Sequence, residues 1–312
     1  MYWHNTRYRP RPKRSWRKIF FLALFALLVI TVVRRPEPAV LSPVPEDTGE
    51  NRSIIRYLFP PHKKDPEDLQ RDVQNIVDNA WPNYSVLVKD MASDFSMGIN
   101  ENIIYMAASV NKIPILTSLY YLAQKEDVDL DEMITLQPAD IQDYGTGSIR
   151  YSAPGTTYSI KTLAKLMIQQ SDNTAAYILA NHVVGISIMQ SLMNDWGLTQ
   201  TDIVSNKTSN RDMAILLEKL YKGGITGTAL TQEALAFLKD TDFENRLPAL
   251  LPKGATVYHK IGTEVRIIHD VGIVKDGDTA YYIGVLTADV LDEEGAEALI
   301  AKISKKVWEY ME

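Results

Sequence analysis

Hydrophobic and polar positions change their spacing several times along the chain, and each change predicts a new element. The segment that begins at Asp65 has an acidic start with a proline, followed by apolar residues at positions 69, 73, 76 and 77. This spacing places the apolar residues on one face and predicts a helix. Two alternating segments follow, YSVLVKD and FSMGIN, with MASD between them. They predict an antiparallel hairpin.

The middle of the chain has mostly helical periodicity. We expect helices over about 111–125 and 161–182, and in three later segments, GISIMQSLMNDWG, NRDMAILLEKLYKGG and TQEALAFLKD. The first two of these later segments end in glycine, which is common at helix C-termini. The middle of the chain is therefore expected to form an all-helical lobe.

The pattern returns to strands near the C-terminus. The segments ATVYHKIGT, HDVGIVKDG and TAYYIGVLTADV have the composition of strands separated by turns. The final segment, EEGAEALIAKISKKVWEYM, is amphipathic and predicts a terminal helix. Strands at both ends of the chain enclose a helical middle. This order predicts an α/β (α+β) fold, with a mixed sheet flanked by terminal helices and an inserted all-helical lobe.

One apolar segment near the N-terminus does not belong to this fold. IFFLALFALLVITVV is about 15 residues long, and roughly 20 are needed to span a hydrocarbon core. Lys18 and Arg34 at its ends can extend it by snorkelling. A cleaved signal peptide is the alternative, but RRPEPAVLSP follows the segment in place of a small-residue cleavage site. We therefore expect an uncleaved signal anchor over 19–35.

Basic residues assign an orientation to this anchor. Seven lysines and arginines and no acidic residue precede it, which predicts a cytoplasmic N-terminus. We expect residues 1–18 to be a basic cytoplasmic tail and residues 36–64, rich in proline and charge, to be a linker. Residues 65–312 would then be the extracytoplasmic domain of a single-pass protein of the cell membrane.

Composition narrows the classes of function. The 312 residues are 46% hydrophobic and 23% charged, which is typical of a globular protein. The net charge is −6 although the N-terminal tail is basic, so the remainder is acidic and nucleic acid is not an expected partner. The absence of cysteine excludes disulfides and thiolate chemistry. No segment has the pattern of a metal cluster or a phosphate-binding loop, so we expect no metal and no cofactor.

The first candidate for chemistry is a serine that precedes a lysine by three residues. Ser109 and Lys112 occur in ASVNKIPIL, and this spacing places both side chains on one face of a helix. A neutral amine within hydrogen-bond reach can activate a hydroxyl as a nucleophile. The spacing alone is not specific, because it also occurs in SWRK, within the basic tail.

Two further motifs support a site. Ser171, Asp172 and Asn173 occur in QQSDNTAAYIL, where they could simply cap a helix. Lys260 and Gly262 occur on a predicted strand, in HKIGTEVRIIHDVGIV, where a lysine could simply protect a sheet edge. Each motif alone has an ordinary structural explanation. Their joint occurrence, in this order and on these element types, favours an active site.

The three motifs together resemble the active-site serine family of class A β-lactamases and penicillin-binding proteins, over about residues 65–312. The resemblance implies a mainly antiparallel sheet and a nucleophilic Ser109. It also implies that Lys112, with a pKa lowered by burial and by Lys260 as a second cation, acts as the base. Ser171 would carry protons between the two amines and the leaving nitrogen.

The resemblance also implies a set of substrate-binding groups. Asn173 would donate a hydrogen bond to a substrate amide carbonyl, and the backbone amides of Ser109 and Thr263 would form the oxyanion hole. Gly262 would let the substrate approach the strand closely. Tyr144 would form one wall of the cleft, although ordinary packing is an equal alternative.

Three departures from the family pattern bear on the mechanism. Class A enzymes have a glutamate, in a long loop between the second and third motifs, that activates the deacylating water. Here the corresponding interval, 196–212, is short and contains no glutamate, and Asp202 is the only acidic residue well inside it. Ile261 stands where the third motif of the family normally has a hydroxyl, which helps to hold the substrate carboxylate. The hydroxyl of Thr263 could partly take over this role. Arg266 is the nearest candidate for an arginine that anchors the substrate carboxylate. Loss of one positioned base typically costs about 10² to 10⁴ in rate, so acylation is expected without efficient hydrolysis.

Three functions are compatible with these observations. The first is a membrane-anchored serine hydrolase that forms an acyl-enzyme with a β-lactam or a related amide or ester. The second is a penicillin-binding D,D-peptidase that acts on peptidoglycan stem peptides, which would explain the linker and the missing glutamate. The third is a catalytically silent module that binds the cell wall. Such a module would have no need for both lysines.

Overall fold

A five-stranded sheet forms the centre of the part of the chain that the computed structural model describes, residues 64–312. Its strand order is β2-β1-β9-β8-β7, and every neighbouring pair is antiparallel. Segments from the two ends of the described chain therefore pair directly, as β1 does with β9. The strands are β1 (Asn83–Asp90), β2 (Ser96–Ile99), β7 (Thr256–Glu264), β8 (Ile267–Asp276) and β9 (Thr279–Ala288).

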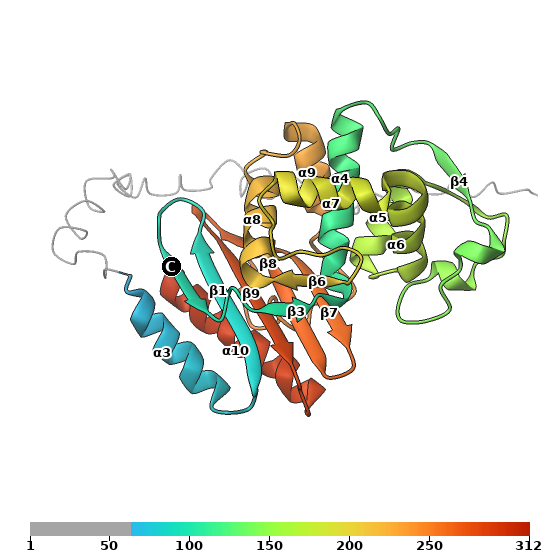
Figure 1. Cartoon of the computed structure of the whole chain (residues 1–312). Coiled ribbons are helices and arrows are strands. Elements are labelled where there is room, and N and C mark those ends of the chain that lie inside the picture. Colours follow the sequence, from blue (N-terminus) through green and yellow to red (C-terminus); the bar gives the residue numbers. More distant parts are fainter. Residues whose placement is uncertain (1–63) are drawn as a thin grey trace, which may run out of the picture. The chain divides into compact units, whose positions relative to one another are not determined.

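Two helices from opposite ends of the described chain cover one face of this sheet (Figure 1). Helix α3 (Pro66–Val77) begins where the side chain of Asp65 accepts a hydrogen bond from the Glu67 amide, with proline at the first position. Helix α10 (Glu293–Met311) packs against it. The apolar stripes of both helices join the sheet in one core, which includes Leu69, Val73, Val86, Ile283, Ile300 and Val307.

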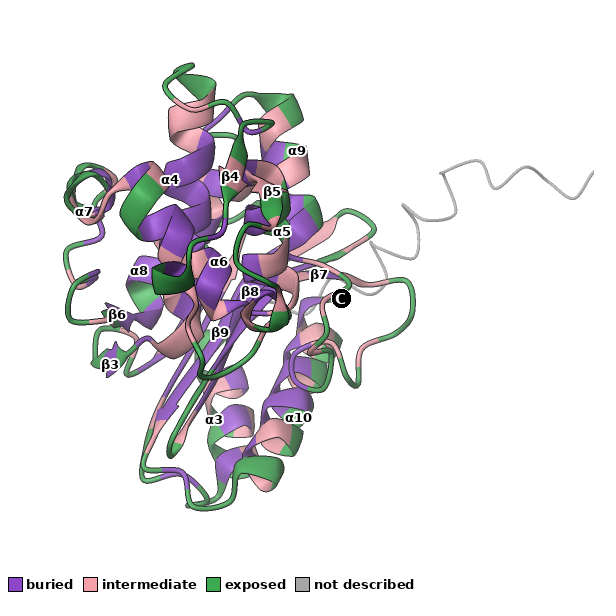
Figure 2. Cartoon of the chain, turned by 90° about the vertical axis from the view of Figure 1, so that its right-hand side faces the viewer, coloured by how far each residue is buried: buried purple, intermediate pink, exposed green. Residues whose placement is uncertain are grey.

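A helical lobe covers the opposite face. Helix α4 lies at its centre and is buried along most of its length (Figure 2), while α8 packs directly on β1 and β9. The helices of the lobe are α4 (Lys112–Gln124), α5 (Ile160–Gln169), α6 (Asn173–Ile178), α7 (Ile186–Asp195), α8 (Asn210–Tyr221) and α9 (Thr228–Phe237). Two short strand pairs complete it, β3 (Ile104–Met106) with β6 (Lys207–Ser209) and β4 (Met133–Thr135) with β5 (Thr157–Ser159).

The predicted fold class is confirmed by this arrangement, although the sheet is wholly antiparallel and not mixed, and the lobe includes two short strand pairs. One predicted helix is interrupted. Residues 161–182 do not form a continuous helix, because Ser171 adopts a left-handed conformation with φ of 54°. Asp172 then starts α6 by accepting a hydrogen bond from the Ala175 amide at 2.9 Å. Apolar periodicity continues across this break and therefore hides it in the sequence. The interruption turns the side chain of Ser171 toward α4, as described below.

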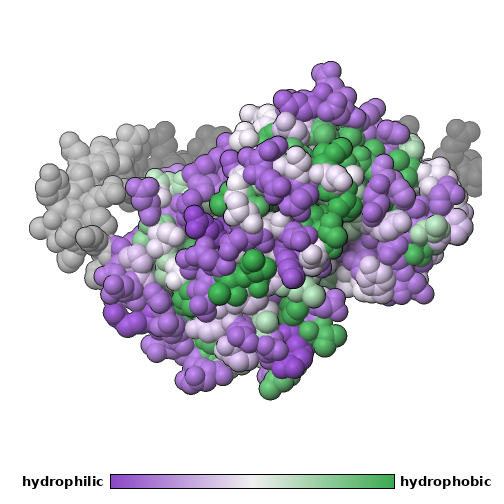
Figure 3. All heavy atoms as spheres, viewed as in Figure 1, coloured by the Kyte–Doolittle hydropathy of each residue, from purple (hydrophilic) through white to green (hydrophobic). Residues whose placement is uncertain are grey.

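The predicted tail and anchor, and the predicted linker as far as residue 63, lie outside the residues that the structure describes. Within residues 64–312, no single helix is long and apolar enough to cross a membrane. The segments Asn173–Val184 and Ile186–Asp195 meet the criteria of length and composition only as a pair, and they are bent by 82°. The face in Figure 3 is largely hydrophilic with apolar groups scattered over it. Ile104 and Met106 of β3 are among the exposed apolar side chains.

Candidate active site

A cleft of about 760 Å³ lies at the start of α4. Its walls come from segments far apart in the sequence: the chain before α4 and the start of α4, the loop between β4 and β5, the start of α6, the residue before β6, the segment before β7, the end of β7 and the first turns of α10. The side chains and backbone that line it include Ser109, Lys112, Tyr144, Thr146, Ser171, Asn173, Asn206, Phe243, Arg246, Ile261, Thr263 and Glu297. The fold, and not the local sequence, therefore assembles this cleft.

Ser109 and Lys112 meet because a one-turn 3-10 helix leads directly into α4. Ser109 lies within this turn, Ala108–Asn111, and Lys112 is the first residue of α4. Pro114 falls in the first turn of α4, where its missing amide proton leaves no helical hydrogen bond unmade. The Lys112 Nζ lies 3.1 Å from the Ser109 Oγ. The expected contact between the amine and the hydroxyl is therefore present.

The other contacts of Lys112 leave its amine suited to accept a proton. Its Nζ lies 2.5 Å from the carbonyl oxygen of Ser171 and 2.7 Å from Oδ1 of Asn173. Both of these oxygens can only accept hydrogen bonds, so they take the two N–H bonds of a neutral amine. The remaining lone pair is then free for the hydroxyl proton of Ser109. This is the geometry that a general base requires.

Burial of Lys112 favours the neutral form. Its side chain is 5% exposed. Desolvation lowers its pKa to about 7, against an opposing effect from the negative charge of Asp172. At neutral pH a substantial fraction of this amine is unprotonated, whereas an exposed lysine would be almost wholly charged.

Lys260 reaches the same region from β7. Its Nζ lies 3.0 Å from the Ser171 Oγ, and it also donates to the carbonyl of Ile261 at 3.0 Å. Burial, followed by the positive charge of Lys112, holds the pKa of Lys260 well below its usual range. The ring of Phe243 lies over this amine, with 5.9 Å between Nζ and the ring centroid. Ser109, Lys112, Ser171 and Lys260 thus form one connected set of polar groups, which we call the Ser109 ring.

Asn173 is fixed by contacts on both sides of its amide. Its Oδ1 accepts from Lys112, and its Nδ2 donates to the carbonyl of Tyr144 at 3.1 Å. The second proton on Nδ2 remains for a substrate. The neighbouring Asp172 is structural, because its carboxylate accepts hydrogen bonds from the Ala175 and Ile149 amides. The side chain of Tyr144 is largely exposed and lines the cleft, as the resemblance implies.

The glycine of the third motif permits close packing between β7 and the chain before Ser109. A Cβ on Gly262 would lie 3.0 Å from the carbonyl oxygen of Ala107 and 3.1 Å from Cγ2 of Val110. No larger residue fits there without moving one of these groups. Gly262 thereby brings the end of β7, including Thr263, beside the nucleophile. It does not line the cleft, so the expected role of Gly262 in the approach of the substrate is replaced by close packing within the protein.

The arginine of the cleft is Arg246, and not Arg266. Arg266 lies in the turn after β7, is exposed, and contacts Asp289. It does not line the cleft. Arg246 lies before β7 and is 3% exposed. Its guanidinium donates to Thr263 Oγ1 at 2.7 Å and to Glu297 at 2.9 Å. The segment that carries Arg246 is irregular, so no periodicity in the sequence could place it.

The interval 196–212, where class A enzymes carry the deacylating glutamate, supplies little to the cleft. Within residues 196–212, only Asn206 lines it, and its carbonyl accepts a hydrogen bond from the Ala107 amide at 2.8 Å. Asp202 is exposed and its carboxylate binds Ser205. Asp212 is buried and accepts from Thr201 at 2.8 Å. Neither carboxylate of this interval reaches the cleft.

The described part of the chain offers no candidate metal-binding site. Residues 64–312 contain no group of three or more histidine, cysteine, aspartate or glutamate side chains that could hold a metal ion. The groups that can react are those of the Ser109 ring. With a positioned base, a nucleophile and an amide donor, this arrangement can perform acyl transfer.

Comparison with known proteins agrees with this chemistry. A model of the β-lactamase enzyme family matches residues 68–311. The β-lactamase VEB-1 of Pseudomonas aeruginosa is 23% identical over 273 residues, which cover 78% of this chain and 90% of VEB-1. The β-lactamase regulatory protein BlaB of Streptomyces cacaoi is 23% identical over 303 residues, which cover 77% of this chain and 96% of BlaB.

Solved structures share the fold. PBP-A is 28% identical with a TM-score of 0.72, over 78% of this chain and 95% of PBP-A. The extended-spectrum β-lactamase TLA-1 is 22% identical with a TM-score of 0.72, over 78% of this chain and 98% of TLA-1. The family match covers nearly all the described residues and includes every member of the Ser109 ring. This chain therefore belongs to the β-lactamase enzyme family and is a serine hydrolase of the β-lactamase type.

Proposed function

We propose that Ser109 attacks the carbonyl of a β-lactam, or of a related amide or ester, and forms an acyl-enzyme. The contact between the Lys112 amine and the Ser109 hydroxyl is the observation on which this proposal depends. In the first step, the hydroxyl proton moves to Lys112 Nζ while the Oγ–carbon bond forms. Two acceptors at 2.5 and 2.7 Å hold that amine in place, so its lone pair is directed to the nucleophile.

The second step breaks the bond between the carbonyl carbon and the leaving nitrogen. That nitrogen needs a proton, and the proton taken from Ser109 is available on Lys112. Ser171 Oγ lies 3.1 Å from Lys112 Nζ and 3.0 Å from Lys260 Nζ, so its hydroxyl can receive a proton from one side and donate its own to the substrate. For a β-lactam the leaving nitrogen stays attached within the opened ring, and no fragment leaves.

Side chains around the Ser109 ring favour a substrate that carries both an amide and a carboxylate. The free Nδ2 proton of Asn173 suits an amide carbonyl. Thr263 Oγ1 accepts from Arg246, so its hydroxyl proton is free for a substrate carboxylate, and the guanidinium, whose five N–H bonds already have acceptors, adds its positive charge. The backbone amides of Ser109 and Thr263 are the proposed oxyanion hole, where the negative charge of the tetrahedral intermediate develops.

We propose that the acyl-enzyme is released slowly. Within residues 196–212, no carboxylate lines the cleft, so this interval offers no general base for a deacylating water. The carboxylates that do line the cleft are Glu264, at the end of β7, and Glu297, which is bound to Arg246. A single-residue variant of PBP-A, 29% identical to this chain, has been solved as an acyl-enzyme complex with penicillin G. Slow release is also expected of a penicillin-binding D,D-peptidase that has reacted with a β-lactam. Such a peptidase is therefore the second candidate function.

The place of action is proposed from the sequence pattern. The expected anchor at 19–35, an apolar segment with a strongly basic flank before it, would hold the domain outside the cytoplasmic membrane. A β-lactam or a peptidoglycan-like substrate would then meet the cleft outside the membrane. Fractionation of cells that express the full chain, with protease protection of intact cells, tests this topology.

A time course of intact mass tests the acyl-enzyme. The full chain in detergent is incubated with penicillin G, and Ser109→Ala is treated in parallel. Ser148→Ala is a control, because Ser148 is exposed and lies outside the ring. We expect one adduct on the full chain and on Ser148→Ala, and none on Ser109→Ala. A lasting adduct favours the peptidase, and an adduct that turns over favours the β-lactamase. If the full chain stays unmodified, acylation is refuted, and the catalytically silent module that binds the cell wall remains as the candidate function.

A further inference from the structure

The cleft wall opposite the start of α4 is an irregular segment, residues 241–251, which we call the wall segment. It lies between α9 and β7 and has neither helix nor strand structure. Three of its residues, Phe243, Asn245 and Arg246, line the cleft. Because no backbone ladder fixes this segment, its position depends on individual contacts with the sheet and with α10.

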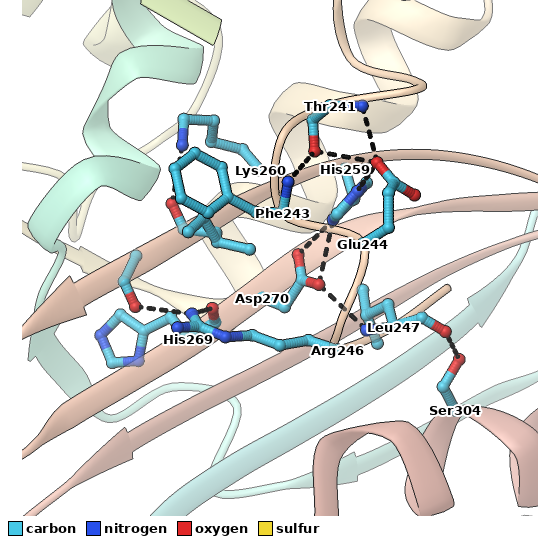
Figure 4. A network of polar contacts seen from close by, with 12 residues as sticks. Thr241, Phe243, Glu244, Arg246, Leu247, His259, Lys260, His269, Asp270 and Ser304 are labelled. Atoms are coloured by element: carbon cyan, nitrogen blue, oxygen red, sulfur yellow. Dashed lines mark hydrogen bonds and ion pairs between the residues drawn. The ribbon is translucent and has the colours of Figure 1, made fainter. Parts of the chain in front are cut away.

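Most of these contacts converge on β7 and β8 (Figure 4). Arg246 donates to the carbonyl of Gly262 at 3.1 Å and to that of His269 at 2.6 Å. The Leu247 amide donates to Asp270 at 3.1 Å. Leu247 also accepts a hydrogen bond from the Ser304 hydroxyl of α10 at 2.7 Å. These bonds fix the second half of the wall segment.

In the first half, Glu244 Oε1 accepts from the amide and the hydroxyl of Thr241 at 2.7 and 2.9 Å, and it is tied to β7 by a histidine that the Ser109 ring does not use. His259 precedes Lys260 on β7, so the two side chains point to opposite faces of the sheet. The ring of His259 is fully buried. Its Nδ1 lies 2.9 and 3.0 Å from the two carboxylate oxygens of Asp270, and its Nε2 lies 3.2 Å from Glu244 Oε1. Figure 4 shows the ring between these two carboxylates.

Both ring nitrogens of His259 therefore face acceptors. A neutral imidazole has one N–H donor, whereas the imidazolium has two, so only the charged form satisfies both carboxylates. The surrounding charges agree with this assignment. Burial opposes the charged form, but the charge and hydrogen bond of Asp270, followed by those of Glu244, outweigh it and raise the pKa of His259 to about 9. The charged side chains on the elements packed around the ring are Asp270, Glu244, Arg246, Lys260 and, through Arg246, Glu297.

We propose that the imidazolium of His259 is a positioning residue, which holds Glu244 and thereby the wall segment against β7. Glu244 is two residues from Arg246 in the chain, so the bond from His259 to Glu244 restricts where the guanidinium can lie. When this bond is lost, the wall segment moves away from β7 and the carboxylate-binding end of the cleft loosens. Phe243 of the same segment lies over the Lys260 amine, with 5.9 Å between Nζ and the ring centroid, whereas the contact between Lys112 and Ser109 involves no residue of the segment, so the base and the nucleophile keep their geometry.

The effect on substrate rests on the proposed acylation of Ser109, and Glu244→Gln tests it. This variant keeps the shape of Glu244, which is partly exposed, and removes one of the two charges that hold the imidazolium. Asp242→Asn is a matched control, with the same change of charge in the same segment at an exposed side chain. Stopped-flow kinetics with a fluorescent penicillin separate the dissociation constant of the initial complex from the rate of acylation.

We expect Glu244→Gln to raise that dissociation constant by roughly two- to thirty-fold, the usual range for coupling through a contact network, with little change in the acylation rate at saturation. Asp242→Asn should match the full chain in both constants. The positioning role is refuted if the two variants behave alike, or if Glu244→Gln changes only the acylation rate.

Two readouts do not depend on acylation. Nitrogen-15 spectra should show both ring N–H groups of His259 up to about pH 8, with a lower midpoint of titration in Glu244→Gln than in Asp242→Asn. Amide hydrogen exchange over 241–251 should be faster in Glu244→Gln than in Asp242→Asn at the same pH. A neutral ring at pH 7, or equal exchange in the two variants, overturns the positioning role. If no adduct forms on the full chain, the proposed function fails while these two readouts still decide the role of His259.

Discussion

Lys112 and Lys260 reach one oxygen from two sides: their Nζ atoms lie 3.1 and 3.0 Å from the Oγ of Ser171. One amine comes from the first residue of α4 and the other from β7, on the opposite side of the cleft. A hydroxyl has one donor and two acceptor positions, so it can pass a proton between two such groups. The left-handed conformation of Ser171, at the break between α5 and α6, is what presents this hydroxyl to both.

Removal of the shared hydroxyl should slow acylation. Ser171→Ala interrupts the path by which Lys112 returns a proton to the leaving nitrogen, and we expect the acylation rate to fall by about 10²-fold or more. Stopped-flow measurement with a fluorescent penicillin reports this rate. Ser148→Ala, at an exposed serine outside the ring, should leave it unchanged. Equal rates in the two variants would rule out a role for Ser171 in proton transfer.

A methyl group on Gly262 should disturb the approach of β7 to the nucleophile. In Gly262→Ala the added carbon would meet the Ala107 carbonyl at 3.0 Å, so the chain before Ser109 or the strand must move. Overpacking of this kind costs about 1 to 3 kcal/mol, and we expect acylation to slow by at least about tenfold. Gly254→Ala is the control, because the nearest atom to its added carbon is 3.9 Å away. Normal stability and acylation in Gly262→Ala would show that the close packing is not required.

Neutralisation of Glu297 should strengthen the binding of carboxylates. Glu297 Oε1 accepts hydrogen bonds from two nitrogens of Arg246, at 2.9 and 3.2 Å, and therefore competes with a substrate for the guanidinium. In Glu297→Gln the positive charge of Arg246 is no longer neutralised by a carboxylate of the protein. We therefore expect the dissociation constant of a penicillin to fall by about tenfold. Glu294→Gln, in the exposed first turn of the same helix, should have no effect. Unchanged or weaker binding in Glu297→Gln would contradict a carboxylate site at Arg246.

Asp172 should matter for folding more than for chemistry. Its buried carboxylate accepts from the Ala175 amide at 2.9 Å and the Ile149 amide at 2.8 Å. Asp172→Asn removes one of these acceptors, and we expect a loss of about 1 to 3 kcal/mol in the free energy of unfolding. Urea denaturation measures it, with the exposed Asp143→Asn as control. A variant with full stability but no acylation would instead assign Asp172 to the reaction.

The element types and the pair of Ser109 and Lys112 can be predicted from short-range spacing, whereas Ser171 and Lys260, which are far away in the sequence, are predicted only by the resemblance of the three motifs to a known family. Alternating strands and apolar helical faces indicate the element types, and the three-residue step from Ser109 to Lys112 is local geometry. The motif predicts Ser171 as part of the site, but it does not predict the break that orients this side chain. A left-handed serine between two apolar helical segments leaves no trace in the periodicity.

Arg246 and His259 cannot be assigned from the sequence for a different reason. The wall segment has no periodicity, and its place beside β7 results from contacts with β8 and α10, which follow it in the chain and which no local pattern relates to it. A lone histidine on a strand indicates neither a partner nor a charge, so His259 is expected only to be packed or solvated. The folded structure is what places two carboxylates against its ring. Arg266 lies nearer to the third motif in sequence, yet it contacts Asp289 outside the cleft.

The pH dependence of acylation tests the account most directly. If neutral Lys112 takes the proton of Ser109, the acylation rate must rise as pH increases, with a midpoint near the lowered pKa of about 7. It should then level off toward about pH 8. Rapid-quench measurements on the full chain, from about pH 5.5 to 8, followed by intact mass, give this profile. A rate that is flat or falls over that range would show that the unprotonated amine of Lys112 is not the base.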